Sequence, residues 1–250
     1  MRATSSFIIA LCVTLLASAA FAQTTTSRCA ECHFANMSSV PAPQHLGDWQ
    51  QSPHGKRDVG CDKCHGGDPM TFQPAEAHRG VLSSDNPASP VYRANLVRTC
   101  APCHERNALA FGQSLHQILV RADDQRAPTC TTCHGVMIAR VPSPVALEAR
   151  CAACHPSGSA RGEYPSLMRD GVERLNAQRA RADELQEAIE RIQDRTRRVE
   201  LLASIYDART AIKEAIAGVH TFDLRTLTER LDTAKRRLDL ITAAVVPTGR

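Results

Sequence analysis

Five short segments of the sequence combine the residue types that could hold a metal-containing group covalently. Ten of the eleven cysteines form five pairs, each with two residues between its members, and a histidine follows each pair directly. This spacing is the pattern of c-type haem attachment. We therefore predict five covalently bound haem c groups. The predicted attachment residues are Cys29, Cys32, Cys61, Cys64, Cys100, Cys103, Cys130, Cys133, Cys151 and Cys154.

The spacing has a chemical reason. Two thiols with two residues between them can reach the two vinyl groups along one side of a porphyrin, and the adjacent histidine then lies below the iron. The residues between the cysteines differ in every segment, from Ala-Glu to Thr-Thr, so the anchors alone define the pattern. The predicted proximal iron ligands are His33, His65, His104, His134 and His155.

Three other uses of paired cysteines are less favoured. Structural zinc sites use cysteine pairs but do not require a histidine directly after each pair. A disulfide framework suits an exported chain, yet it leaves the histidines unexplained. Iron–sulfur clusters need a different run of cysteines. Haem attachment accounts for both residue types at once.

The histidines outside the five motifs are equal in number to the predicted haems. The sequence has ten histidines, and the five spare ones are His45, His54, His78, His116 and His220. One spare histidine for each haem would make every iron bis-histidine and low spin, although the sequence does not say which pairs with which. If His45 is not a ligand, one iron has an open position. Thioethers also bind haem iron, which leaves Met37, Met70, Met137 and Met168 as outside candidates.

Residues 1–22 have the features of a cleavable signal peptide. Arg2 gives a positive start, residues 7–20 are mainly apolar, and Ala20 and Ala22 are small residues where a signal peptidase requires them. The apolar run is shorter than the ~20 residues that a membrane-spanning helix needs. Cys12 lies inside this segment and would be removed with it. We therefore predict cleavage after Ala22 and a periplasmic location.

Residues 23–160 are predicted to form a pentahaem domain, because every cysteine motif lies there. Glycine and proline are frequent in this range, which favours short helices joined by irregular loops, with little strand. So little polypeptide cannot surround five porphyrins separately. The macrocycles are therefore expected to pack together and to form much of the interior, in keeping with an aromatic content of only 4%.

Residues 161–250 are predicted to form a helical C-terminal region that packs on the haem domain. From residue 224 onward, apolar residues recur in alternating steps of three and four, the spacing of one helix face. We expect two or three long helices, with breaks near residues 218–223 and near Thr196. This region would deliver His220 to a haem, and its apolar stripe is compatible with a homo-oligomer. The predicted fold class is thus a mainly α multihaem cytochrome c.

Several segments besides the cysteine motifs carry a family resemblance. They are Trp49–His54 before the second motif, Glu76–His78, Ser114–His116 before the fourth motif, and His220–Asp223 in the helical tail. With these segments, the chain resembles the multihaem cytochromes c related to pentahaem nitrite reductase, hydroxylamine oxidoreductase and their tetrahaem electron-transfer relatives. The resemblance implies that His54, His78, His116 and His220 are distal ligands. It departs from the nitrite reductases because no motif has lysine in place of the proximal histidine.

These observations favour an electron carrier. Its expected partners are a quinol-oxidising membrane cytochrome, a terminal reductase or other cytochromes, with membrane contact only through such partners. No catalytic residue is predicted. The formal net charge of +4 does not favour nucleic acid, since two propionates on each haem would offset it. One alternative is a multihaem oxidoreductase with one open-site haem acting on nitrite, hydroxylamine, tetrathionate or a similar species. Another is a structural subunit of an outer-membrane conduit.

Overall fold

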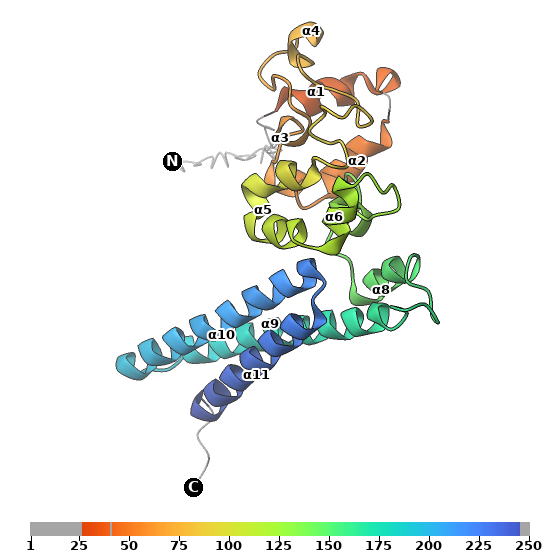
Figure 1. Ribbon diagram of the computed structural model, residues 1–250. Coiled ribbons are helices and arrows are strands. Elements are labelled where there is room, and N and C mark those ends of the chain that lie inside the picture. The colour runs from red at the N-terminus through yellow and green to blue at the C-terminus, as the bar shows by residue number, and fades with distance from the viewer. Residues whose placement is uncertain (1–26, 41, 246–250) are drawn as a thin grey trace, which may run out of the picture.

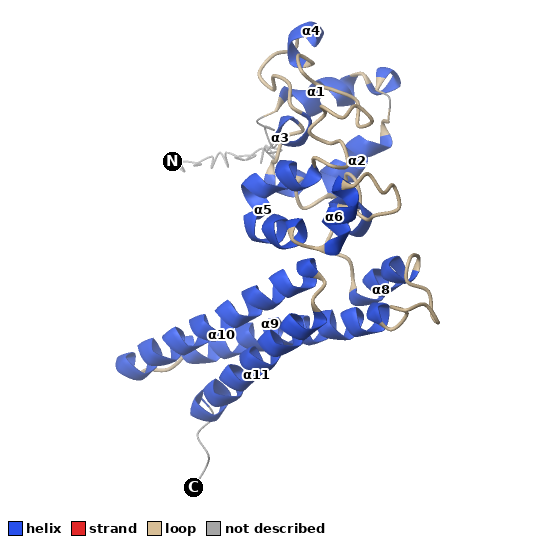
Figure 2. Ribbon diagram, in the orientation of Figure 1, coloured by secondary structure: helices blue, strands red, loops and turns tan. Residues whose placement is uncertain are grey.

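Helices form all the regular secondary structure that the computed structural model describes. It describes residues 27–40 and 42–245, and no strand occurs within these ranges (Figure 2). The predicted mainly α fold class is therefore confirmed. The predicted signal peptide and its cleavage after Ala22 lie outside the described residues. No helix in the described ranges is long and apolar enough to cross a membrane.

Short helices joined by loops make up the part of the chain that carries the cysteine motifs (Figure 1). The α-helices are α1 (Arg28–Ala35), α2 (Gln44–Gln51), α3 (Asp62–His65), α4 (Pro74–Ala77), α5 (Leu96–Gly112), α6 (Leu115–Arg121), α7 (Cys130–His134) and α8 (Pro144–Ala152). Two 3-10 helices, η1 (Met37–Ser39) and η2 (Gly55–Arg57), lie among them.

Each cysteine motif begins on or beside a helix. In a helix, residues three and four positions apart lie on one face, so both thiols and the following imidazole of one motif point to the same side. In the second, third and fourth motifs the helix ends or bends at the histidine. Gly66 and Gly135 follow His65 and His134 with φ values of 77° and 84°, a conformation that glycine adopts without steric cost. In α5, His104 itself departs from helical geometry.

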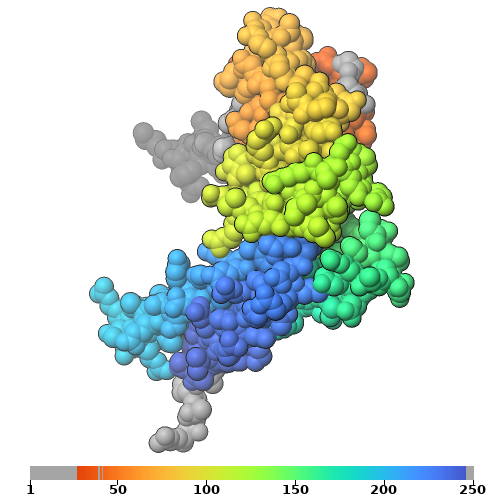
Figure 3. Space-filling model, in the orientation of Figure 1, coloured from red at the N-terminus to blue at the C-terminus, as the bar shows by residue number. Residues whose placement is uncertain are grey.

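Three long helices form an arm beneath the haem-motif region (Figures 1 and 3). They are α9 (Tyr164–Glu190), α10 (Arg195–Thr221) and α11 (Leu224–Val245). The breaks between them fall where the sequence predicted. The apolar stripe of α11 is buried against α9 and α10 as expected, at Leu227, Leu231, Ala234, Leu238 and Ile241. In Figure 1 one end of this arm lies against α5 and α6, and the other end projects away from them.

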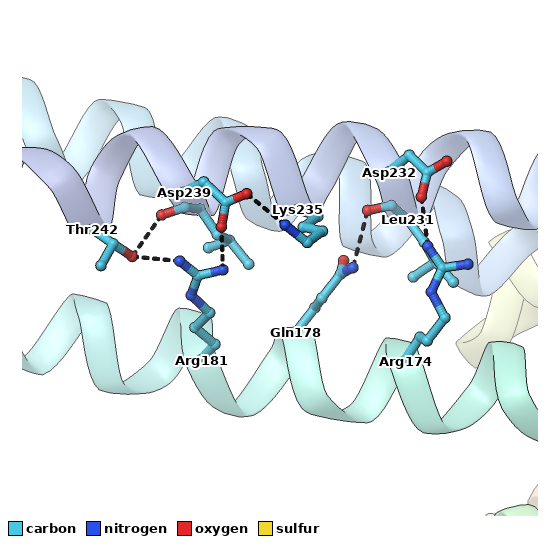
Figure 4. Close-up of polar contacts among 9 residues, drawn as sticks. Arg174, Gln178, Arg181, Leu231, Asp232, Lys235, Asp239 and Thr242 are labelled. Carbon is cyan, nitrogen blue, oxygen red and sulfur yellow. Dashed lines mark hydrogen bonds and ion pairs between the residues drawn. The ribbon is translucent and has the colours of Figure 1, made fainter.

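Polar contacts between α9 and α11 fix the register of the arm (Figure 4). Arg181 donates to Asp239 and to Thr242 at 2.6 Å, and Arg174 pairs with Asp232 one helical heptad away. Between these pairs, the buried Gln178 amide donates to the Leu231 carbonyl at 3.0 Å. Partly exposed ion pairs contribute at most about 1 kcal/mol each. The common seven-residue spacing of these pairs therefore matters more for aligning α9 with α11 than for the stability of the fold.

A close approach of backbones joins the three helices near the haem-motif region. A methyl group on Gly218 of α10 would lie 3.1 Å from the backbone of Leu227 in α11, and one on Gly171 of α9 would lie 2.7 Å from the Leu227 side chain. Small residues at these positions let α11 start immediately beside the end of α10. The turn between these two helices, residues 222–223, is thereby held against α5.

Candidate functional site

Eight of the ten histidines lie in four opposed pairs, each joining one motif histidine to one spare histidine. The ring-centre separations are 5.8 Å for His33–His78, 5.9 Å for His54–His104, 6.2 Å for His116–His155 and 6.2 Å for His134–His220. The members of each pair come from different helices or loops, so the fold brings them together.

These separations match two imidazoles bound to opposite sides of one metal ion. An imidazole nitrogen binds a metal at about 2.0–2.1 Å, and two rings placed in this way have centres about 6.3 Å apart. Ordinary ring stacking would allow closer approach. The spaces between the paired histidines therefore have the dimensions of bis-histidine iron sites.

The remaining motif histidine is His65 of the second motif, and the remaining spare histidine, His45, lies within electrostatic reach of it. Burial lowers the pKa of His65 from its ordinary value, and the charge of His45 is the next contribution to that shift. His45 lies at the start of α2. The structure thus places four predicted proximal ligands opposite four predicted distal ones, and His45 within electrostatic reach of His65.

Two of the spare histidines are held by the same local arrangement. Each is two residues after a buried serine, Ser52 for His54 and Ser114 for His116. Each serine hydroxyl donates to a carbonyl three residues earlier at 2.7 Å. It also accepts from an amide three residues later, at 3.0 Å for Ser52 and 3.2 Å for Ser114. These bonds fix the start of η2 and α6, and therefore the place of each histidine.

Backbone carbonyls orient three other rings. The Nδ1 atoms of His78, His134 and His220 lie 2.9 Å from the carbonyl oxygens of Pro74, Arg140 and Ile216, respectively. With the proton on Nδ1, each ring donates to its carbonyl and leaves the Nε2 lone pair free. Ligand histidines in metal sites are commonly oriented in this way.

Burial favours the neutral form of five of the histidines at the candidate sites. It is the largest cause of a lowered pKa at His33, His54, His65, His116 and His220, followed for the first four by the charge of the opposed histidine. At His220, the Ile216 carbonyl opposes this shift, and His134 adds to it. A neutral imidazole is the form that binds a metal.

No disulfide bond joins any of the ten described cysteines, and the cysteines of successive motifs are neighbours. Cys103 and Cys154 are exposed and the others are half-buried. The thiols of Cys100 and Cys130 share a hydrogen bond, which is the main cause of a raised pKa at Cys100 and a lowered pKa at Cys130. Burial raises the pKa of Cys61 to about 11, with Cys29 as the next contribution. Burial and then Cys100 raise the pKa of Cys64 in the same direction.

A family comparison agrees with this geometry. A family model described as cytochrome c554 and c-prime matches residues 14–66, which include the first two cysteine motifs. This match supports a c-type cytochrome. Comparisons with curated proteins and with solved structures gave no match. A c-type cytochrome holds its haem covalently and takes part in electron transfer, which are the properties that the cysteine motifs predict.

The residues at each paired site fit the haem of a c-type cytochrome. Two thiols and a histidine lie on one face of a helix, and a second imidazole stands opposite at the spacing of an iron complex. Within residues 27–40 and 42–245, no group of three or more histidine, cysteine or acidic side chains could hold a metal ion. Cysteines of each motif would supply the thioether bonds, and the paired histidines would supply the two axial ligands.

The methionines lie in less suitable places. Met168 is buried in the hydrophobic core of the arm, where a thioether fills space between helices. Met37 and Met70 are exposed. The histidine pairs therefore describe the candidate sites without a methionine.

One residue beside the sites belongs to the His220–Asp223 segment, but its residue type alone did not predict a role for it. The Phe222 ring lies edge-to-face against the His116 imidazole, with ring centres 4.4 Å apart at 78°. Phe222 has a positive φ of 58°, which is uncommon for a bulky residue. Only the packing of α10 and α11 against α5 brings it there, so a pattern of residue types could not reveal it.

Proposed function

We propose that the protein is a periplasmic pentahaem cytochrome c that transfers electrons between redox partners of a respiratory chain. The observation that carries the proposal is the opposition of four motif histidines to four spare histidines, with His45 within electrostatic reach of His65. Haem supplies reversible one-electron exchange between ferrous and ferric iron. The chain supplies attachment, axial ligands, spacing and shielding from solvent, which together set each reduction potential.

The opposed pairs give each haem its proposed axial ligands. Haems are numbered here by the order of their cysteine motifs. The pairs are His33 and His78 for haem 1, His65 and His45 for haem 2, His104 and His54 for haem 3, His134 and His220 for haem 4, and His155 and His116 for haem 5.

This assignment uses every spare histidine and favours an electron carrier over an enzyme. An iron with two imidazole ligands has no vacant position for nitrite, hydroxylamine or a sulfur species. The alternative enzyme required that His45 not be a ligand. The electrostatic effect of His45 on His65 supports the carrier instead.

The neighbouring thiols support a linear order of haems along the chain. Cys29 interacts with Cys61, Cys64 with Cys100, Cys100 with Cys130, and Cys133 with Cys151. Each contact joins one motif to the next. The attachment points of successive motifs therefore lie near one another, which supports an order from haem 1 to haem 5.

The proposed partners bind briefly. Redox encounters commonly bury less than about 1,200 Å² of surface, and a short-lived complex suits a carrier that must meet both a donor and an acceptor. We propose a quinol-oxidising membrane cytochrome, a terminal reductase or another cytochrome in these two roles. The protein itself would meet the membrane only through them.

The test is the composition and spectrum of the purified holoprotein. We expect the mass of residues 23–250 plus five haems, low-spin spectra, and no change when carbon monoxide is added to the reduced form. His45→Ala is the matched positive control, since removing one distal ligand should open one iron in five to carbon monoxide. A carbon monoxide complex at one fifth of the haem in the unaltered protein would favour the enzyme.

A further inference from the structure

The turn between α10 and α11 serves two neighbouring haem sites. His220, near the end of α10, faces His134 of the haem 4 site at 6.2 Å between ring centres. Two residues later, Phe222 contacts His116 of the haem 5 site at 4.4 Å between ring centres. The same short segment therefore places a ligand at one site and an aromatic ring on a ligand of the next.

The two sites differ in how their ligand rings are hydrogen-bonded. At the haem 4 site, the Nδ1 atoms of both His134 and His220 lie 2.9 Å from backbone carbonyl oxygens. At the haem 5 site, Nδ1 of His116 is buried and has no hydrogen-bond partner. An aromatic ring, which offers no carbonyl oxygen, packs on this imidazole instead.

Phe222 is held firmly in this place. Its backbone has φ 58° and ψ 29°, the left-handed conformation at the end of α10. Asp223 directly after it bonds back to the Gly218 carbonyl through its amide, and its carboxylate accepts from Arg225 and Thr226. On its other side the ring contacts Phe111 of α5 at 6.1 Å between centres. A left-handed conformation costs a non-glycine residue roughly 1–2 kcal/mol, so surrounding contacts must hold it.

Hydrogen bonding at Nδ1 changes what an axial histidine donates to iron. A ligand that donates its Nδ1 proton to a carbonyl is more basic at Nε2 and stabilises the ferric state. A ligand without that bond donates less charge and leaves the ferrous state relatively favoured.

We propose that Phe222 is a positioning residue that withholds a hydrogen bond from His116 and thereby raises the reduction potential of haem 5. The proposal rests on the five-haem assignment above. The proposed increase is measured against the reduction potential that haem 5 would have if Nδ1 of His116 donated a hydrogen bond. Under this proposal, the turn between α10 and α11 helps to give haem 4 a more basic distal histidine than haem 5.

The test compares two substitutions that both remove the ring. Asparagine in Phe222→Asn readily adopts a left-handed backbone and offers a carbonyl oxygen to Nδ1. Leucine in Phe222→Leu has a similar size and offers no acceptor. In a spectroelectrochemical titration of the holoprotein, we expect Phe222→Asn to move one fifth of the absorbance change to lower potential. The expected shift is at least tenfold in the oxidised-to-reduced equilibrium, or about 59 mV for one electron.

Three further measurements make the result decisive. Phe222→Leu and the exposed Tyr206→Asn on the same helix should leave all five potentials in place. His116→Met should move the same fifth upward, because a thioether ligand raises the potential, and so identifies it as haem 5. Equal shifts in Phe222→Asn and Phe222→Leu, or no shift in either, would overturn the proposal. Haem content is measured on every sample, so that a wild-type protein with fewer than five haems would instead refute the pentahaem assignment.

Discussion

At the scale of single residues, the candidate sites depend on side chains that fix the position of a ligand without touching the metal. Ser52 and Ser114 hold the segments of His54 and His116 through paired hydrogen bonds. Asp223 does the same for the turn beside His220, since its carboxylate accepts from the Arg225 and Thr226 amides. Capping interactions therefore help to set the positions of these candidate ligands.

Replacing Asp223 should destabilise this turn in a pH-dependent way. The Thr226 side chain is the largest cause that holds the pKa of Asp223 below its ordinary value. A lowered carboxyl pKa stabilises the folded state above the unfolded value of about 3.9, and this contribution is lost as pH falls through the folded pKa. Loss of a helix cap costs about 1 kcal/mol, so Asp223→Ala should lower the melting temperature at pH 7 by about 2–4 °C.

Asp223→Asn is the control for this prediction. Asparagine caps helices about as well as aspartate, so it should retain most of the stability at pH 7. The difference between wild type and Asp223→Ala should shrink as the pH is lowered below 4, when the wild-type carboxylate becomes protonated. A difference independent of pH over this range would contradict the capping role.

Sequence alone was enough to identify residues but not to pair them. The spacing of Cys29 and Cys32 before His33 predicts an attachment site because its chemistry is local. The opposition of His116 and His155 depends on how α6 meets the end of α8, which no local pattern contains. Phe222 was missed for the same reason. The five distal ligands and five haems stay predictions that the geometry supports.

At the scale of helices, the long elements were predictable and the short ones were not. The steps of three and four between Leu224 and Val245 define α11 because one face must be buried. By contrast, α3 and α4 each have four residues, too few for a periodic pattern. The single turn of α3 lies within a cysteine motif, and that of α4 begins at Pro74. Their formation depends on contacts with the rest of the fold.

The contact between α10 and α11 provides a test at this scale. A methyl group on Gly218 would meet the Leu227 backbone at 3.1 Å, and backbone atoms cannot rotate away. Although alanine normally favours a helix by about 1 kcal/mol over glycine, overpacking here should cost about 1–3 kcal/mol. We expect Gly218→Ala to lower the melting temperature and to disturb the ligation of haem 4 through His220.

Gly171→Ala is the matched comparison. Its added methyl group would meet the end of the Leu227 side chain at 2.7 Å, and that group can change rotamer. The loss of stability should therefore be smaller, with the haem 4 spectrum unchanged. If both variants had the same effect on haem 4, the proposed link between the Gly218 contact and His220 would be wrong.

At the scale of the whole molecule, the two regions obtain their stability from different sources. The hydrophobic core extends over α8 to α11 and includes Leu185, Ile205 and Leu238. The haem-motif region has scattered buried side chains, such as Trp49 and Val120. Its interior is expected to be completed by the porphyrins.

This contrast predicts how the chain behaves without haem. When it is produced without a haem-attachment system, hydrogen exchange should remain slow in residues 164–245 and become fast in residues 28–135, because protection follows local burial. The fully loaded protein should protect both regions. Equal protection of both regions in the haem-free chain would show that the porphyrins are not part of the core.

The matched spacing of Arg174 and Arg181 on α9 with Asp232 and Asp239 on α11 has a consequence for assembly. Since His220 lies at the end of α10, just before the turn into α11, a slip of one heptad that carried this turn along with α11 would displace the imidazole by about 10 Å along the bundle. The iron of haem 4 could then gain its sixth ligand only after the helices had locked in the correct alignment. A low-spin iron at haem 4 would thus indicate, during maturation, that α9 and α11 have packed in the correct register.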